Sequence, residues 1–132
     1  MDYAKLGMAI GGVFVFVFLY EWLFHGVVLK KTYTASQSLW RLPKDCVWQA
    51  LISGQALLAV IFSLFYALCG AGTGLEAGLL FGVMLGAVMA PHHLMMYAVV
   101  PYPPKLVMAW IAGGVLEMGV CGAIVGWIYV VV

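Results

Sequence analysis

Four long apolar stretches constrain what this chain can fold into more than any other feature. They cover about residues 6–29, 47–69, 76–100 and 106–131. Each is long enough to cross a hydrocarbon core about 30 Å thick, which takes roughly 20 helical residues. Two of the connections between them are very short, so consecutive helices should run antiparallel. The sequence therefore predicts an all-α integral membrane protein, an antiparallel four-helix bundle that forms a single domain over residues 1–132.

The amino-acid composition excludes an ordinary soluble domain. Hydrophobic residues make up 66% of the chain and charged residues 8%, whereas soluble domains carry about 25% charged residues. The net charge of +1 gives no reason to expect a nucleic-acid partner. Cys46, Cys69 and Cys121 form neither a disulfide framework nor a Cys-x-x-Cys metal motif. We therefore expect the lipid bilayer as the main partner, with a homo-oligomer or a larger membrane complex as further candidates.

The basic residues are distributed unevenly between the connections. One side of the membrane would hold the first and third connections, and the other side the second connection and both termini. The basic residues of the first side are Lys30, Lys31, Arg41, Lys44 and Lys105, against Lys5 on the other. Because loops rich in Lys and Arg stay in the cytoplasm, we expect the first and third loops to be cytoplasmic and both termini to lie outside.

The first loop mixes aromatic and basic side chains, among them Tyr33, Trp40 and Arg41. Such a mixture is typical of the headgroup layer of a membrane. We expect this loop to form either a short interfacial helix or an irregular segment at the membrane surface.

Polar and ionisable side chains occur within the apolar stretches, where a charge costs roughly 2.5–3.5 kcal/mol at the bilayer centre. Glu21 and His25 are four residues apart and would lie on one face of a helix. A rise of about 1.5 Å per residue puts the polar groups of all four spans in overlapping layers. The predicted network consists of Glu21, His25, Gln55, His92, His93 and Glu117. We interpret it as an interior site that orients the helices or handles a proton or small cation.

Pro91 directly precedes two adjacent histidines in the third stretch. Proline removes a backbone donor, so it should interrupt the helix there. Interrupted helices at membrane depth tend to line cavities. Adjacent residues point about 100° apart on a helix, so we expect only one of His92 and His93 to face the bundle centre.

The alternative is a metal- or haem-binding carrier. Met89 and Met96 share a helix face with one of the histidines, and imidazole with thioether suits copper(I). The full candidate ligand set is His25, His92, His93, Met89, Met96 and Cys121. His25 and one of the later histidines would also suit a b-type haem across the core, whereas the absence of Cys-x-x-Cys-His excludes covalent haem. Methionines that simply fill gaps in the core remain the plain interpretation.

Small residues recur at every fourth position on three of the stretches. They are Gly78, Gly82 and Gly86 on the third, Gly122 and Gly126 on the fourth, and Gly7 and Gly11 on the first. Small residues at this spacing let helix backbones approach closely in lipid. We interpret them as packing positions within the bundle, with a homodimer face as the alternative.

The segments 21–29 (EWLFHGVVL) and 39–41 (LWR), together with Tyr33 between them, resemble a small uncharacterised family of bacterial four-span inner-membrane proteins. Residues 76–82 (EAGLLFG) and 100–103 (VPYP) are similar to the later motifs of that family. The resemblance implies a bacterial inner-membrane location and a four-span layout, but no activity. The sequence contains no nucleophile elbow, phosphate loop, HExxH motif or dinucleotide fingerprint, so soluble-type enzyme chemistry is not expected.

Overall fold

The computed structural model describes residues 1–69 and 71–132, and this part of the chain contains helices and connections but no strand. The predicted all-α fold is confirmed. The main helices are α1 (Tyr3–Leu23), α3 (Trp48–Cys69), α4 (Leu75–Met89), α5 (Pro91–Val99) and α6 (Pro104–Val131).

Among the described residues, four helical stretches are long and apolar enough to cross a membrane. They are Tyr3–Val28, Trp48–Cys69, Leu75–Val99 and Pro104–Val131. Many large apolar side chains on them are exposed, for example Leu57 and Val88. Exposed apolar surface on this scale is unfavourable in water and suits lipid. The structure therefore fits a multi-pass integral membrane protein.

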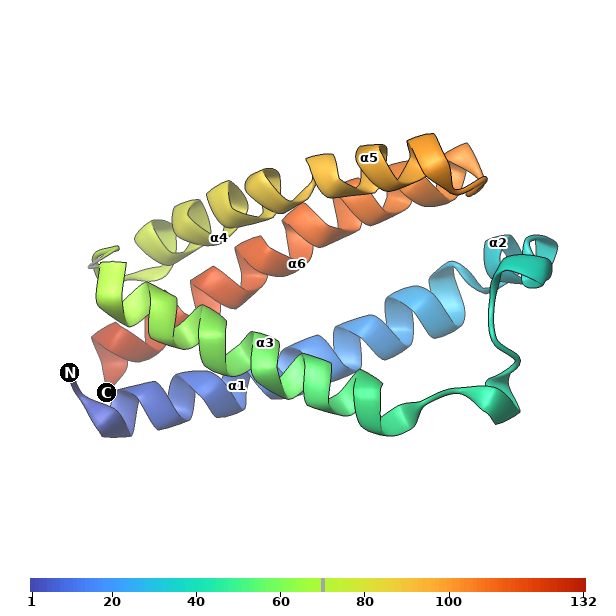
Figure 1. Cartoon of the computed structure of the whole chain (residues 1–132). Coiled ribbons are helices and arrows are strands. Elements are labelled where there is room, and N and C mark those ends of the chain that lie inside the picture. Colours follow the sequence, from blue (N-terminus) through green and yellow to red (C-terminus); the bar gives the residue numbers. More distant parts are fainter. Residues whose placement is uncertain (70) are drawn as a thin grey trace.

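The helices form two layers that are joined along one side. Figure 1 shows α4, α5 and the first half of α6 in one layer, with α1 and α3 in the other. The closest packing is between α4 and α6, and α1 packs against both α3 and α6. By contrast, α3 has very few backbone contacts with α4 or α5. The two layers are thus held together mainly through α1 and α6 and lie farther apart on the side of α3 and α5.

Glycines bring the backbones of α4 and α6 into direct contact. Gly78 and Gly82 on α4 are buried, as are Gly122 and Gly126 on α6. A Cβ atom on Gly82 would overlap the backbone carbonyl of Met118, and one on Gly78 would overlap the carbonyl of Gly122. Any side chain at these positions would therefore force the two helices apart, as expected for small-residue packing in lipid.

The two glycines with the same spacing on α1, Gly7 and Gly11, do not contact another helix among the described residues. A Cβ atom on Gly7 or Gly11 would meet nothing within 4 Å in the described part of the chain. These two glycines are exposed and face outward. The spacing of small residues therefore does not by itself identify which helix faces meet.

The apolar core lies in the half of the molecule that contains both termini. It is built where α1, α3 and α6 meet, from side chains such as Val13, Val17, Phe62, Cys121 and Val125. Figure 1 shows the N- and C-termini side by side at this end. The functional candidates lie in the opposite half, toward the first and third connections.

Two irregularities shape that opposite half. The first span ends in a π-helix, η1 (Phe24–Val28), in which the Leu29 N–H donates to the Phe24 carbonyl over 2.9 Å. In the third span, Ala90 keeps helical backbone angles, but Pro91 lacks an N–H to continue the hydrogen-bond ladder, and α5 begins at that residue. Both irregularities lie beside the histidines of the sequence-based site.

The first connection is partly helical. It contains α2 (Lys30–Ala35) and the short 3-10 turns η2 (Gln37–Leu39) and η3 (Pro43–Asp45). The sequence GAGTG at residues 70–74 predicts a tight turn in the second connection, and its first residue, Gly70, lies outside the described residues. Further along it, Gly72 and Gly74 have φ values of +94° and +107°, which favour glycine because it has no Cβ atom.

Candidate functional site

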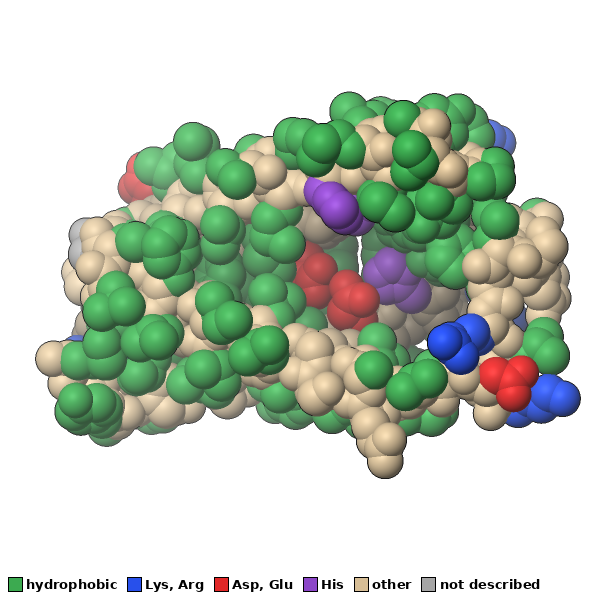
Figure 2. Space-filling model, viewed as in Figure 1, with side chains coloured by type: hydrophobic (Ala, Val, Ile, Leu, Met, Phe, Trp, Pro, Cys, Tyr) green, Lys and Arg blue, Asp and Glu red, His purple; other side chains and the backbone are tan. Residues whose placement is uncertain are grey.

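A cavity of about 440 Å³ lies between the spans and receives residues from all four of them. Its acidic and histidine lining residues are Glu21, His25, His92, His93 and Glu117. Figure 2 shows acidic and histidine side chains inside a hollow between the two layers, surrounded by hydrophobic side chains. The structure therefore gathers five of the six residues of the predicted polar network around one space.

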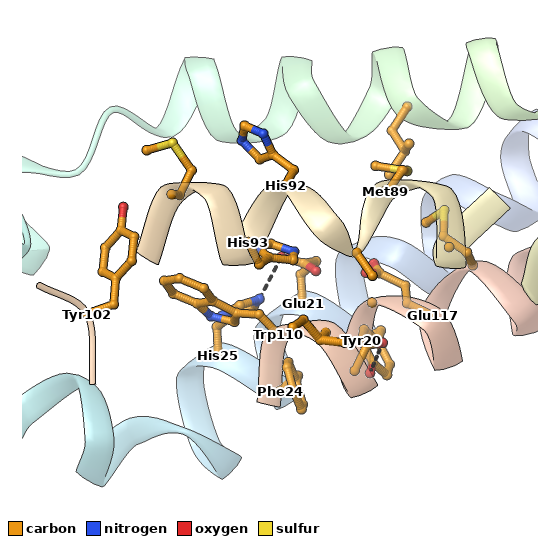
Figure 3. Close-up of a pocket in the computed structure, with 18 of the residues that line it drawn as sticks. Tyr20, Glu21, Phe24, His25, Met89, His92, His93, Tyr102, Trp110 and Glu117 are labelled. Atoms are coloured by element: carbon orange, nitrogen blue, oxygen red, sulfur yellow. Dashed lines mark hydrogen bonds and ion pairs between the residues drawn. The ribbon is translucent and has the colours of Figure 1, made fainter. Parts of the chain in front are cut away.

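Glu21 on α1 and Glu117 on α6 both line this cavity, and Figure 3 shows their side chains directed into the same space. Glu117 is only 7% exposed, and its Oε1 atom has no hydrogen-bond partner among the described residues. The Glu21 side chain is 27% exposed. Two ionised carboxylates side by side in apolar surroundings repel each other and lose hydration. A carboxyl pair of this kind is expected to hold one shared proton.

A directed chain of polar contacts ends at this pair. The Trp110 Nε1–H donates to the Tyr33 hydroxyl over 2.9 Å, and that hydroxyl lies 2.5 Å from His25 Nδ1. The other ring nitrogen, His25 Nε2, is 3.2 Å from Glu21 Oε2. An indole N–H can only donate, so the Tyr33 hydroxyl accepts from Trp110 and can donate to His25. This assignment leaves the proton of neutral His25 on Nε2, where it donates to the Glu21 carboxylate.

The π-helix η1 positions His25 for this role. Its wider turn ends the first span at Leu29, and α2 then brings Tyr33 back against the imidazole. The two rings lie 5.7 Å apart, centroid to centroid. π-helical turns occur frequently at functional sites because they change the direction of the side chains that follow.

Tyr33 lies outside the membrane spans, and burial raises its pKa to about 12. The hydrogen bond from Trp110 opposes this shift, and the negative charge of Glu21 adds to it. Tyr33 is therefore protonated throughout the physiological range and is available as a donor to His25.

We expect Tyr33 to deprotonate near pH 12, in line with its raised pKa. Its tyrosinate absorbance is the part of the signal that the Tyr33→Phe variant lacks. The folded state holds this proton more tightly than the unfolded chain. The contribution of Tyr33 to stability is therefore present below about pH 10 and is lost as the pH rises through about 12. The measurement is a difference titration at the tyrosinate band. Tyr3→Phe, which removes an 80% exposed tyrosine, is the control. A Tyr33 signal near the ordinary value of about 10 would contradict this environment.

An aromatic cluster covers the cavity at the end of the first and third connections. Trp40 stacks on Tyr102 with ring centroids 5.6 Å apart, and Tyr102 packs edge-on against Trp110 at 5.0 Å. His93 lies 5.6 Å from Trp110, and Tyr33 lies 5.2 Å from Trp40. Aromatic pairs contribute about 0.5–1.5 kcal/mol each beyond their buried area. The cluster joins the first loop, the third connection and α6 into one cover.

The structure decides between the two adjacent histidines. Figure 3 shows His93 on the side of α5 that faces Glu21 and His25, and His92 on the opposite side of that helix. His92 is exposed at the rim of the cavity, whereas His93 is half-buried. His93 is therefore the inward-facing residue of the pair.

The predicted network is less buried than the sequence suggested. Of its six residues only Glu117 and Gln55 are buried, at 7% and 8% exposure. Gln55 lies in a second cavity of about 670 Å³, on the other side of a wall formed by Glu21, His25 and Tyr33. The network is therefore divided between two cavities, because Gln55 on α3 faces the space between α1, α3 and the first loop.

The alternative ligand set is not gathered at one point. Among the described residues, no group of three or more His, Cys, Asp or Glu side chains is arranged to hold a metal ion. Cys121 lies in the apolar core and is fully buried there, away from the cavity lining. Met89 and Met96 do line the cavity. Both ring nitrogens of His25 already have partners, Tyr33 and Glu21, so haem ligation would first have to break these contacts.

Residues that the sequence interpretation left out complete the site. Trp110 was given no role, and Tyr33 and Trp40 were assigned to the membrane interface. In the structure all three residues belong to the chain of polar contacts that ends at Glu21 or to the aromatic cluster that covers the cavity. Tyr20 also lines the cavity and donates to the Gly113 carbonyl over 2.7 Å. The sequence signal that could have pointed to these residues is that a buried Tyr hydroxyl or Trp N–H needs a polar partner.

Comparison with protein-family models, with curated proteins and with solved structures found no match to this chain.

Proposed function

We propose that this chain is a bacterial inner-membrane protein that binds and transfers a proton at the Glu21–Glu117 pair. The observation that carries the proposal is that these two carboxyl groups from different spans line one cavity, with Glu117 buried and one of its oxygens unpartnered among the described residues. Stability alone gives no reason to keep such a group in a membrane, since an unpaired buried polar atom costs about 1–3 kcal/mol. Ionisable groups retained at membrane depth are characteristic of proton pathways.

The second cavity supplies the access route for the proton. It is lined by Lys30 and Arg41 of the first loop, and by Gln55, whose Oε1 has no partner among the described residues. Unpartnered buried polar atoms mark positions where water is held. In this proposal a proton passes through water in the second cavity to the Glu21 carboxylate and then to Glu117.

The orientation that goes with this proposal has the first and third loops in the cytoplasm and both termini outside. It is supported by the concentration of Lys and Arg in those two loops. The second cavity then opens toward the cytoplasm. The exposed apolar side chains of the spans would contact lipid in this arrangement.

Infrared spectroscopy of the protein in lipid tests the proton site directly. We expect a protonated-carboxyl band at pH 7 that is lost in Glu117→Gln and shifted in Glu21→Gln, because the two groups share one proton. Glu76→Gln is the matched control, since Glu76 is an exposed residue in the first turn of α4. Absence of the band from the unmodified protein at pH 7, or its persistence in both site variants, would overturn the proposal.

A further inference from the structure

We propose that the 440 Å³ cavity binds an organic monocation with a hydrophobic body, which enters from the lipid between α3 and α5 and displaces the proton shared by Glu21 and Glu117. This inference rests on the proposed proton site and names the substrate class that would use it.

The charge of the cavity selects for a cation. Glu21 and Glu117 are its acidic groups, and no Lys or Arg is among the described residues that line it. The unpartnered Oε1 of Glu117, on a side chain 7% exposed, lacks a donor or a positive charge. A bound cation would provide that missing partner, whereas an anion would meet two carboxyl groups at close range.

The walls of the cavity suit an organic cation better than a metal ion. Trp110 and Tyr102 present aromatic rings, and Met89, Met96 and Met118 present thioethers. Aromatic faces attract cations through the ring quadrupole, and methionine adapts to irregular apolar shapes. Figure 3 shows Trp110, Tyr102 and His93 around the same space as the carboxyl groups. The described residues provide no cluster of three His, Cys, Asp or Glu ligands for a bare metal.

The size of the cavity and its position favour entry from the membrane. A volume of about 440 Å³ lies within the range of small-molecule sites, about 300–1,000 Å³. α3 contributes little more than Leu58 to the lining and has very few backbone contacts with α5. Figure 2 shows the hollow between the two layers with acidic side chains inside it. A cation with an apolar body concentrates in the bilayer and would reach the carboxyl groups from this side.

The exchange conserves charge. Before binding, the pair holds one proton and carries a net charge of −1. When a monocation enters, that proton leaves as H⁺, and both carboxylates together with the cation again carry −1. The proton departs from Glu21 into the second cavity, past His25 and Gln55. One cation is therefore exchanged for one proton, and no covalent bond other than O–H is broken.

Binding of tetraphenylphosphonium to the full chain in detergent tests this inference. We expect saturable binding of one ion per protein with release of about one proton at pH 7, detected by calorimetry in buffers of different ionisation enthalpy. Tetraphenylborate has the same shape with the opposite charge and is expected not to saturate. In Glu117→Gln we expect affinity to fall at least about tenfold. Equal binding of the borate, or unchanged phosphonium affinity in Glu117→Gln, would overturn the inference.

A second variant keeps the test valid if Glu117→Gln fails to fold. Met96→Trp fills the cavity and leaves both carboxyl groups in place, so it should weaken phosphonium binding about tenfold. Met84→Trp, on the exposed side of α4 and outside the cavity lining, is the matched control. A normal infrared carboxyl band without phosphonium binding would overturn the cation site alone. A missing band would overturn the proton site as well.

Discussion

Replacing Gly82 with alanine is expected to lower the free energy of unfolding by about 3 kcal/mol, near the upper end of the usual cost of overpacking. The added Cβ atom would overlap the backbone carbonyl of Met118 on α6. A carbonyl within a helix has no alternative rotamer, so the two helices have to separate along the contact that joins them most closely. Separation of α4 from α6 would also displace α5 and His93 from the cavity.

The measurement is reversible unfolding in mixed detergent, followed by the loss of helical circular dichroism. Gly11→Ala is the matched control, because a Cβ atom there meets nothing within 4 Å in the described part of the chain. We expect that variant to remain within about 0.5 kcal/mol of the unmodified protein. Equal stability of the two variants would show that the glycine contact between α4 and α6 does not hold the bundle together.

Replacing Glu117 with methionine is expected to have the opposite effect on stability, a gain of about 1–3 kcal/mol. Glu117 is 7% exposed and has an oxygen without a partner among the described residues. Methionine has a similar length and no group that requires hydration, and its neighbours Met118 and Cys121 already form apolar contacts. The same variant should lose both the protonated-carboxyl band and phosphonium binding.

This pair of effects separates a functional residue from a structural one. When a residue is kept for function at the expense of stability, replacing it with an apolar residue makes the protein more stable. Leu116→Met is the control, because Leu116 is the 59% exposed neighbour of Glu117 on α6. If Glu117→Met unfolded at lower denaturant concentration than this control, Glu117 would be the anchor of a structural network, and the proton proposal would lose its main support.

Several features of the fold were accessible from the sequence because they depend on local properties. Apolar stretches long enough to cross a bilayer predict helices wherever they occur, and the structure has helices at all four. Pro91 predicts an interruption from its own chemistry, and α5 begins at that residue. Glu21 and His25 are within reach of each other because their spacing of four residues places them on one helix face.

The candidate site was less accessible because it depends on how helices are rotated against each other. Gly11 and Gly82 occur in the same spacing pattern, yet one faces open space and the other a backbone carbonyl. Distance along the helix predicts Gln55 in the same layer as Glu21, but it does not show that Gln55 lines a second cavity, between α1, α3 and the first loop. The only signal for Trp110 is that a buried indole N–H needs a polar partner, and the sequence does not show that Trp110 is buried.

The sequence by itself determined the helices, their apolar character and the presence of titratable groups within them, since apolar length and residue spacing act within one segment. The tertiary structure alone decided that His93 rather than His92 faces Glu21, and that Glu117 on α6 lines the same cavity as Glu21. The physical reason is that each helix presents several faces of similar hydropathy. Which face is buried depends on the closest approach available to its neighbours, here the contact of Gly78 and Gly82 with α6.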